Sequence, residues 1–186
     1  MQRISVHLPA HRRHTSLRVR RVKASDFKTK NRYETASERF TLFSQTMHCM
    51  KDPMRYKKAD SRIFSVKFVN EGSIDCGGPM RDFISNLCLE IMSDVLPLLR
   101  PTGNNLARME PGMDCYTLNA KSKEPHMLKK FTWLGYMLGW SLRNMAGLAI
   151  DLPIALWKRI CNGSKNYVYD LDDLREIDVY RSDMLK

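Results

Sequence analysis

The fold is decided by residues 63–91, which read IFSVKFVNEGSIDCGGPMRDFISNLCLEI. The first seven of these residues alternate, with Phe64, Val66 and Phe68 on one side and Ser65 and Lys67 on the other. Successive side chains of a strand point to opposite faces, so this spacing predicts a strand with one face in the core and one in water.

A glycine-rich turn and a helix follow this strand. The turn contains Gly72, Gly77 and Gly78 and ends on Pro79. Proline suits the first turn of a helix because it lacks an N–H that the helix would leave unpaired there. The apolar residues that follow recur at offsets of 0, 3, 4, 7, 8 and 11, namely Met80, Phe83, Ile84, Leu87, Cys88 and Ile91. This period predicts an amphipathic helix.

Further helices are predicted on either side of this stretch. One is expected to open at Thr35–Glu38, where a hydroxyl and a glutamate form a capping box, and to end at Pro53. Its apolar face would consist of Phe40, Phe43, Met47 and Met50. Others are expected from Met127 to about Met145 and from Asp151 to Gly163.

The remaining segments complete an α+β, mainly helical fold class. Residues 97–112 are rich in proline and glycine and predict irregular structure, followed by a short strand at Cys115–Leu118. Residues 170–186 are acidic at the start and basic at the end, an order that the helix dipole favours. Gly135 and Gly139 lie one turn apart on one helix face, which predicts close packing of another element there.

The positive charge is concentrated in an N-terminal arm, residues 1–32. The chain has 31 Lys and Arg against 20 Asp and Glu, and ten of the basic residues but only Asp26 of the acids lie in the arm. The rest of the chain is therefore nearly neutral. We expect a solvated lead-in, with a short strand around Leu17–Val22. A mitochondrial transit peptide is the alternative, because such peptides are also rich in arginine and poor in acids.

Five cysteines without a CxxC spacing argue against both a disulfide framework and a zinc site. No secretory signal is evident, and no stretch approaches the ~18 uninterrupted apolar residues of a membrane span. The sequence therefore indicates an intracellular protein of the cytoplasm, with the nucleus as an alternative. No metal, cofactor or membrane span is expected.

Two candidate chemistries at the glycine turn are disfavoured. The turn lacks both GxGxxG and GxxxxGK[ST], and Asp75 would repel a phosphate. Cys76 lies near a helix N-terminus, which lowers a thiol pKa, but Asp75 opposes its thiolate. We find no catalytic constellation in the residues themselves.

Four blocks in sequence resemble the HECT ubiquitin-ligase domain. Glu71–Phe83 resembles its G-x-D-x-G-G-x-x-R-E-F turn and helix, although Asp82 stands where glutamate is usual. Phe131–Gly139 resembles its F-x-x-L-G-x-x-L-G helix, and Leu148–Pro153 its L-x-L-D-L-P turn. Asp170–Ser182 resembles its D-L-x-x-[IL]-D-x-x-x-Y-x-S segment. The basic lead-in is also similar to that of such domains.

The resemblance implies that residues 33–186 are a partial HECT domain, the large part of its N-lobe. It implies a cut before the part that grips the ubiquitin-conjugating enzyme and before the catalytic C-lobe. The full-length protein would take ubiquitin from that enzyme as a cysteine thioester and pass it to a substrate lysine. This chain would supply scaffold only, with these residues shaping the turn or packing helices: Asp75, Gly77, Gly78, Arg81, Gly135 and Gly139.

Two alternatives from other classes remain. One is a non-catalytic module that binds a protein partner. The other is a binder of RNA or an anionic surface through the basic arm, for which bulk charge is the only support. Any nucleic-acid binding by the arm is expected to be non-specific and sensitive to salt.

Overall fold

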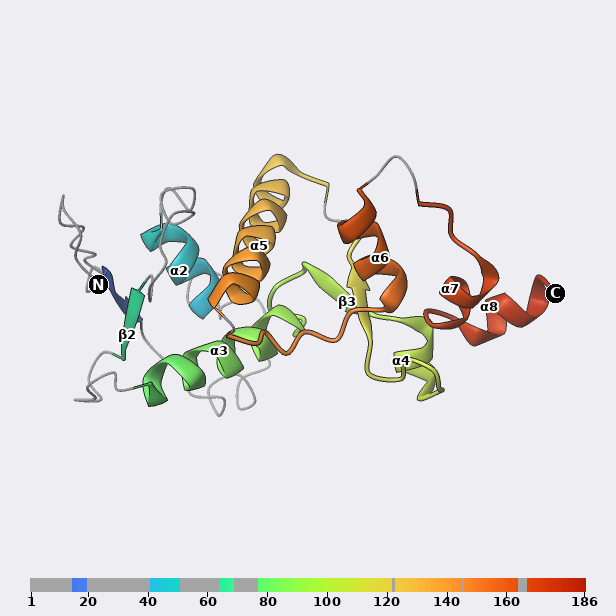
Figure 1. Ribbon diagram of the computed structural model, residues 1–186, viewed down its shortest axis with the longest axis horizontal. Coiled ribbons are helices and arrows are strands. Elements are labelled where there is room, and N and C mark those ends of the chain that lie inside the picture. The colour runs from blue at the N-terminus through green and yellow to red at the C-terminus, as the bar shows by residue number, and fades with distance from the viewer. Residues whose placement is uncertain are drawn as a thin grey trace. The chain divides into compact units, whose positions relative to one another are not determined.

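The computed structural model describes residues 15–19 (backbone), 41–50, 64–68, 77–121, 123–144, 146–163 and 167–186. Its contacts divide the chain into two compact units (Figure 1). The first unit comprises residues 1–91 with 123–149, and the second comprises residues 92–122 with 150–186. No helix in the described part of the chain is both long enough and apolar enough to cross a membrane.

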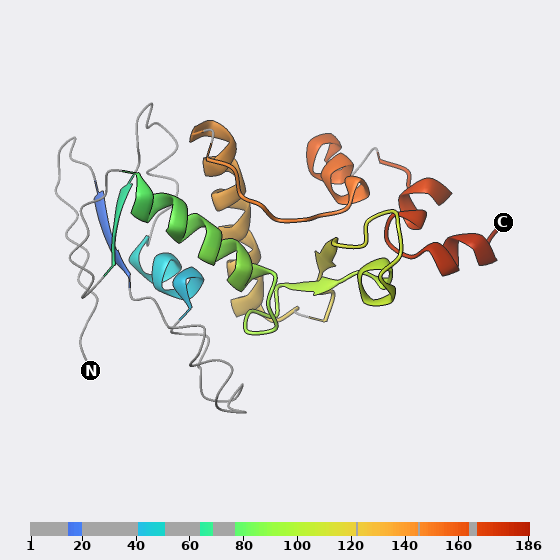
Figure 2. The same cartoon turned by 90° about the horizontal axis from the view of Figure 1, so that it is seen from below.

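The described part of the first unit contains a two-stranded parallel sheet and three helices. These elements are β1 (Thr15–Val19), α2 (Leu42–Cys49), β2 (Phe64–Phe68), α3 (Gly78–Ile91) and α5 (Pro125–Asn144). Leu17 of β1 pairs with Val66 of β2, so the strand expected in the basic segment is present. In Figure 2 the two strands lie side by side, with α2 and α3 next to each other on the same side of them.

Phe64 links the sheet to two helices. Its ring meets that of Phe83 on α3 edge-on, with centroids 6.0 Å apart, and stacks on Trp140 of α5 at 5.2 Å. A second aromatic contact, Phe43 with Trp133 at 4.8 Å, packs α2 against α5. Aromatic pairs of this kind bury large apolar areas in preferred geometries, so they fix the packing of this unit.

The strand and helix predicted within residues 63–91 are confirmed. Phe64, Val66 and Phe68 are buried, whereas Lys67 is exposed. All six apolar residues predicted for the buried face of α3 are buried. The buried side of this helix is thus set by its sequence period alone.

Helix α2 begins later than the sequence predicted. Thr41 is its N-cap, with an extended backbone and a hydroxyl that accepts the N–H of Ser44 at 3.1 Å. The expected capping box at Thr35–Glu38 lies outside the described residues. Of the apolar face expected there, Phe43 and Met50 are buried and Met47 is half-buried.

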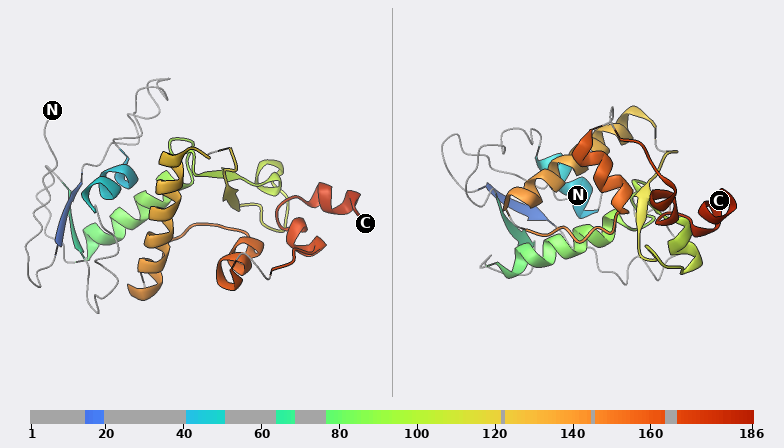
Figure 3. Two further views of the ribbon diagram at one scale, coloured as in Figure 1. Left: turned by 90° about the horizontal axis from the view of Figure 1, so that it is seen from above. Right: turned by 45° about the vertical axis from the view of Figure 1, so that its right-hand side comes forward.

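The described part of the second unit joins an antiparallel strand pair to four short helices. These elements are β3 (Leu99–Pro101), α4 (Gly103–Ala107), β4 (Tyr116–Leu118), α6 (Ile154–Asn162), α7 (Leu171–Arg175) and α8 (Val179–Met184). Figure 3 shows α7 and α8, in dark red, as two consecutive helices. The strand expected at Cys115–Leu118 and the helix expected between Asp151 and Gly163 are confirmed as β4 and α6.

One prediction for this unit was wrong. Residues 170–186, whose charge order favours helix, form two helices, because Asp178 has an extended backbone and caps α8 by accepting the N–H of Arg181. Residues 97–112 contain β3 and α4, although they were expected to be irregular. Helix α4 depends on Asn104, which bonds residues more than seventy positions away in the chain. Sequence periodicity does not report such contacts.

Helix α3 provides a direct test of this packing. Leu87 is fully buried and Leu89 is 65% exposed on the same helix. We expect Leu87→Ala to lower the free energy of unfolding by about 2–5 kcal/mol, because it removes apolar contacts and leaves a cavity. Leu89→Ala, the matched control, should change it by no more than about 0.5 kcal/mol. Urea denaturation followed by circular dichroism measures both, and equal losses would contradict the observed burial.

Candidate functional site

The glycine turn is described from Gly77 onwards, and Asp75 and Cys76 lie outside the described residues. Gly77 has a φ of +113°, a conformation that glycine adopts readily, whereas Gly78 already belongs to α3. The N–H of Arg81 donates to the carbonyl oxygen of Gly77 at 3.2 Å, which closes the first turn of the helix. The structure thus brings Gly77, Gly78 and Arg81 together at the start of α3.

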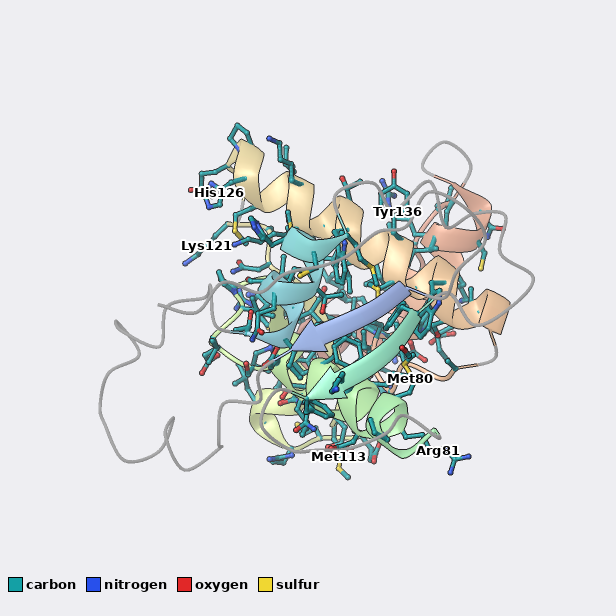
Figure 4. All side chains as sticks on the ribbon, turned by 90° about the vertical axis from the view of Figure 1, so that its left-hand side faces the viewer. Met80, Arg81, Met113, Lys121, His126 and Tyr136 are labelled. Atoms are coloured by element: carbon teal, nitrogen blue, oxygen red, sulfur yellow. The ribbon has the colours of Figure 1, made fainter. Side chains whose placement is uncertain are left out.

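The side chain of Arg81 is exposed and points away from the helix, whereas Met80 beside it is buried (Figure 4). Arg81 therefore contributes to the turn through its backbone, and its guanidinium faces solvent. That Gly77, Gly78 and Arg81 shape this turn for a functional purpose remains a prediction.

The close packing expected at Gly135 and Gly139 stays a prediction. Both are exposed on α5, and a Cβ built on either would meet no atom within 4 Å outside the helix itself. No described element therefore approaches this face of α5 closely. Two glycines one turn apart permit a close approach but do not themselves supply the partner.

Glu90 is a half-buried carboxylate that sequence reasoning missed. It lies at the end of α3, and its two carboxylate oxygens accept the backbone N–H groups of Leu42 and Phe43, at 2.9 and 3.1 Å. These N–H groups open α2 and have no partner within that helix. Burial raises the pKa of Glu90 to about 7, against the lowering effect of the two backbone hydrogen bonds. The sequence signal for this contact was a glutamate between two apolar residues, Leu89 and Ile91, at a helix C-terminus, where the helix dipole disfavours a negative charge.

A second polar cluster lies in the second unit, around the buried carboxylate of Asp173. Its side chain forms an ion pair with Lys158 at 2.9 Å and accepts the hydroxyl of Tyr167. Asp170 and Asp173 also form a reciprocal capping box at the start of α7. Burial acts to raise the pKa of Asp173, but the hydrogen bonds from Tyr167, Lys158 and the backbone together lower it below its usual value. The cluster therefore holds a charged aspartate and ties α6 to α7.

Three of the four described cysteines are buried or have a raised thiol pKa. Cys49 and Cys88 are buried, and burial raises the pKa of Cys49. The pKa of Cys115 is raised by burial and by nearby carboxylates, of which Glu176 and Asp151 act most strongly. Cys161 is exposed. Within the described residues, no group of three or more His, Cys, Asp or Glu side chains is placed to hold a metal ion.

Comparison with known proteins points to one class, the E3 ubiquitin-protein ligases. The chain is 33% identical over 117 residues to the E3 ubiquitin-protein ligase HERC2 of Mus musculus and 32% identical over 117 residues to that of Homo sapiens. Each alignment covers 63% of this chain and 2% of the relative. A putative E3 ubiquitin-protein ligase of Plasmodium falciparum is 26% identical over 140 residues, covering 66% of this chain and 1% of that protein.

These similarities establish a relationship to part of an E3 ubiquitin-protein ligase. The chain spans about 2% of the length of the two HERC2 relatives that it matches. No family model matches the chain. The class expected from the four sequence blocks is thus supported at the level of ubiquitin ligases, over a limited region.

The two glycines of the turn make a matched pair of test positions. We expect Gly77→Ala to lower the free energy of unfolding by about 1–3 kcal/mol, because an L-residue at φ +113° is strained. Gly78→Ala should be neutral or raise it by up to about 1 kcal/mol, since its φ lies outside that range and a Cβ there meets nothing within 4 Å. Thermal melts compare the two variants, and indistinguishable melts would argue against a structural role for Gly77.

Glu90 predicts a specific pH dependence of stability. Its pKa of about 7 in the folded chain lies above the ordinary value of 4.5, so the folded state retains a proton that the unfolded state has released between these values. Stability should therefore decrease as the pH rises from about 4.5 to about 7 and then level off. Glu90→Gln should abolish this decrease, whereas Glu110→Gln, at an exposed glutamate, should preserve it. Urea titrations at a series of pH values measure the slope, and an unchanged slope in Glu90→Gln would refute the assignment.

Proposed function

We propose that this chain is a non-catalytic part of a HECT-type ubiquitin-protein ligase, a piece of the N-lobe that serves as scaffold. The observation that carries the proposal is the 33% identity over 117 residues to an E3 ubiquitin-protein ligase. In the larger protein its partners would be a ubiquitin-conjugating enzyme, ubiquitin and a protein substrate. Ubiquitin would pass through a cysteine thioester on a separate lobe.

The strand and helix that carry the HECT-like motif support this proposal. They form a rigid pair in the first unit, because Phe64 of β2 packs on Phe83 of α3 and both side chains are almost fully buried. Gly77, whose φ is positive, ends the turn. The side chain of Arg81 is exposed, so the buried side of α3 consists of apolar residues. These residues support the backbone of the domain and perform no chemistry themselves.

The surroundings of the cysteines support a role without a nucleophile of its own. A cysteine that accepts ubiquitin must react as the thiolate. The raised pKa of both Cys49 and Cys115 favours the protonated thiol instead. In this proposal the thioester forms on another part of the larger ligase.

The test combines the isolated chain with a chimera. The chain alone, given activating enzyme, conjugating enzyme, ubiquitin and ATP, should form no ubiquitin adduct that a thiol reductant releases. When its aligned 117 residues replace those of the mouse ligase, the chimera should transfer ubiquitin to itself. Introducing Leu87→Ala into the chimera should reduce transfer because it destabilises α3, and Leu89→Ala should not.

Two results would contradict the proposal. One is a reducible ubiquitin adduct on the isolated chain that disappears in a cysteine variant such as Cys76→Ala, because the chain would then carry a catalytic thiol. The other is a chimera that is folded and remains inactive, because the segment would then not serve the scaffold role.

A further inference from the structure

Helix α6 packs through its polar side. One side of this helix consists of four apolar residues at helical spacing, Leu156, Trp157, Ile160 and Cys161. The opposite side consists of Ala155, Lys158, Arg159 and Asn162. A surface helix normally buries its apolar side and exposes its polar side. In α6 the only buried residue is Ala155, on the polar side, and none of the four apolar residues is buried.

Charged and aromatic contacts hold the polar side of α6 in place. The ammonium group of Lys158 pairs with the carboxylate of Asp173 at 2.9 Å and lies 5.9 Å from the centre of the Tyr167 ring. The guanidinium of Arg159 lies 5.8 Å from the centre of the Tyr169 ring. The rings of Tyr167 and Tyr169 meet edge-on. These contacts join α6 to α7 and to the residues just before it.

The first turn of α6 is also held by a charged group. Pro153 is the N-cap and has no side chain that can bond the helix. The carboxylate of Glu176 takes this place and accepts the N–H of Ile154 at 2.9 Å. Glu176 is itself the C-cap of α7. Both the start and the middle of α6 are therefore attached to the α7 region through charged side chains.

Attachment of this kind makes α6 easy to detach. Apolar burial is the dominant favourable contribution to folding, and α6 buries little of its apolar side. The side chain of Lys158 is 44% exposed, so dissolved salt screens its ion pair with Asp173. Parts of a folded protein open locally when few buried apolar contacts hold them. A helix of nine residues is too short to stay folded alone, so α6 should unwind once it detaches.

We propose that α6 is a latched helix, which detaches from α7 and unwinds while the rest of the second unit stays folded. The contacts of Lys158 and Tyr167 with Asp173 are the latch, and their strength determines the detached population. Helices α4 and α8 stay folded because the side chain of Asn104 bonds the backbone at the junction of α7 and α8. Asp173 keeps its capping bonds with Asp170, so α7 also survives the step. A helix that moves goes beyond the proposed scaffold role and does not depend on it.

The first experiment follows amide hydrogen exchange in the full 186-residue chain, read by mass spectrometry of its peptides. The amides of α6 should exchange faster than those of α4 and α8, after division by the rates of unstructured peptides of the same sequence. Raising the salt concentration from about 0.1 M to about 1 M shortens the Debye length from about 10 Å to about 3 Å. Exchange in α6 should then become about threefold faster or more, and exchange in α4 should not change.

The second experiment weakens the latch with single substitutions. Lys158→Met removes the ammonium group but keeps an unbranched side chain, and should speed exchange in α6 by about fivefold. Tyr167→Phe removes only the hydroxyl that bonds Asp173, and should speed it by about twofold or more. Lys186→Met is the matched control, because it removes an ion pair with Asp183 in the same unit. It should leave exchange in α6 unchanged.

Three results would overturn the proposal. One is that α6 exchanges no faster than α4 and α8, because the unit would then open only as a whole. Another is that salt leaves exchange in α6 unchanged. The third is that Lys158→Met and Lys186→Met have equal effects on α6. Unchanged exchange in α4 shows that a variant is folded, and if Lys158→Met fails this check, an unaltered α6 in Tyr167→Phe overturns the proposal.

Discussion

The first unit depends on the burial of one ring, that of Phe64. This side chain is almost fully buried and contacts Phe83 on α3 and Trp140 on α5, so a single strand residue positions both long helices. Close packing in protein interiors leaves little freedom to move such a ring. The glycine turn at the start of α3 is joined to this core through the buried side of that helix.

The second unit depends on a polar residue instead. The amide of the buried Asn104 donates to the carbonyl oxygens of Pro111 and Arg175 and accepts the N–H of Val179, each at 2.7 Å. Gly103 beside it lies so close to the side chain of Asp178 that a Cβ would be 2.9 Å away. A buried polar group is costly unless it is fully bonded, so this network ties α4 to the junction of α7 and α8. Asn104 thereby organises a region with few long helices.

The carboxylates of the half-buried Glu90 and the buried Asp173 hold helices together, and the two described thiols with shifted pKa values, Cys49 and Cys115, favour the protonated form. The similarity to E3 ubiquitin-protein ligases covers a small part of those proteins, which is consistent with a structural element of a larger ligase.

The sequence by itself determined the strand at residues 64–68 and the buried side of α3. Periodicity is a local property, so it can be read without coordinates. Only the tertiary structure decided that Glu90 caps α2 and that Asn104 organises the second unit, because the bonded groups are 47 to 75 residues apart. It also decided that Gly135 and Gly139 are exposed. Their spacing in the sequence places both on one face of the helix, but only the packing of the folded chain determines whether another element covers that face.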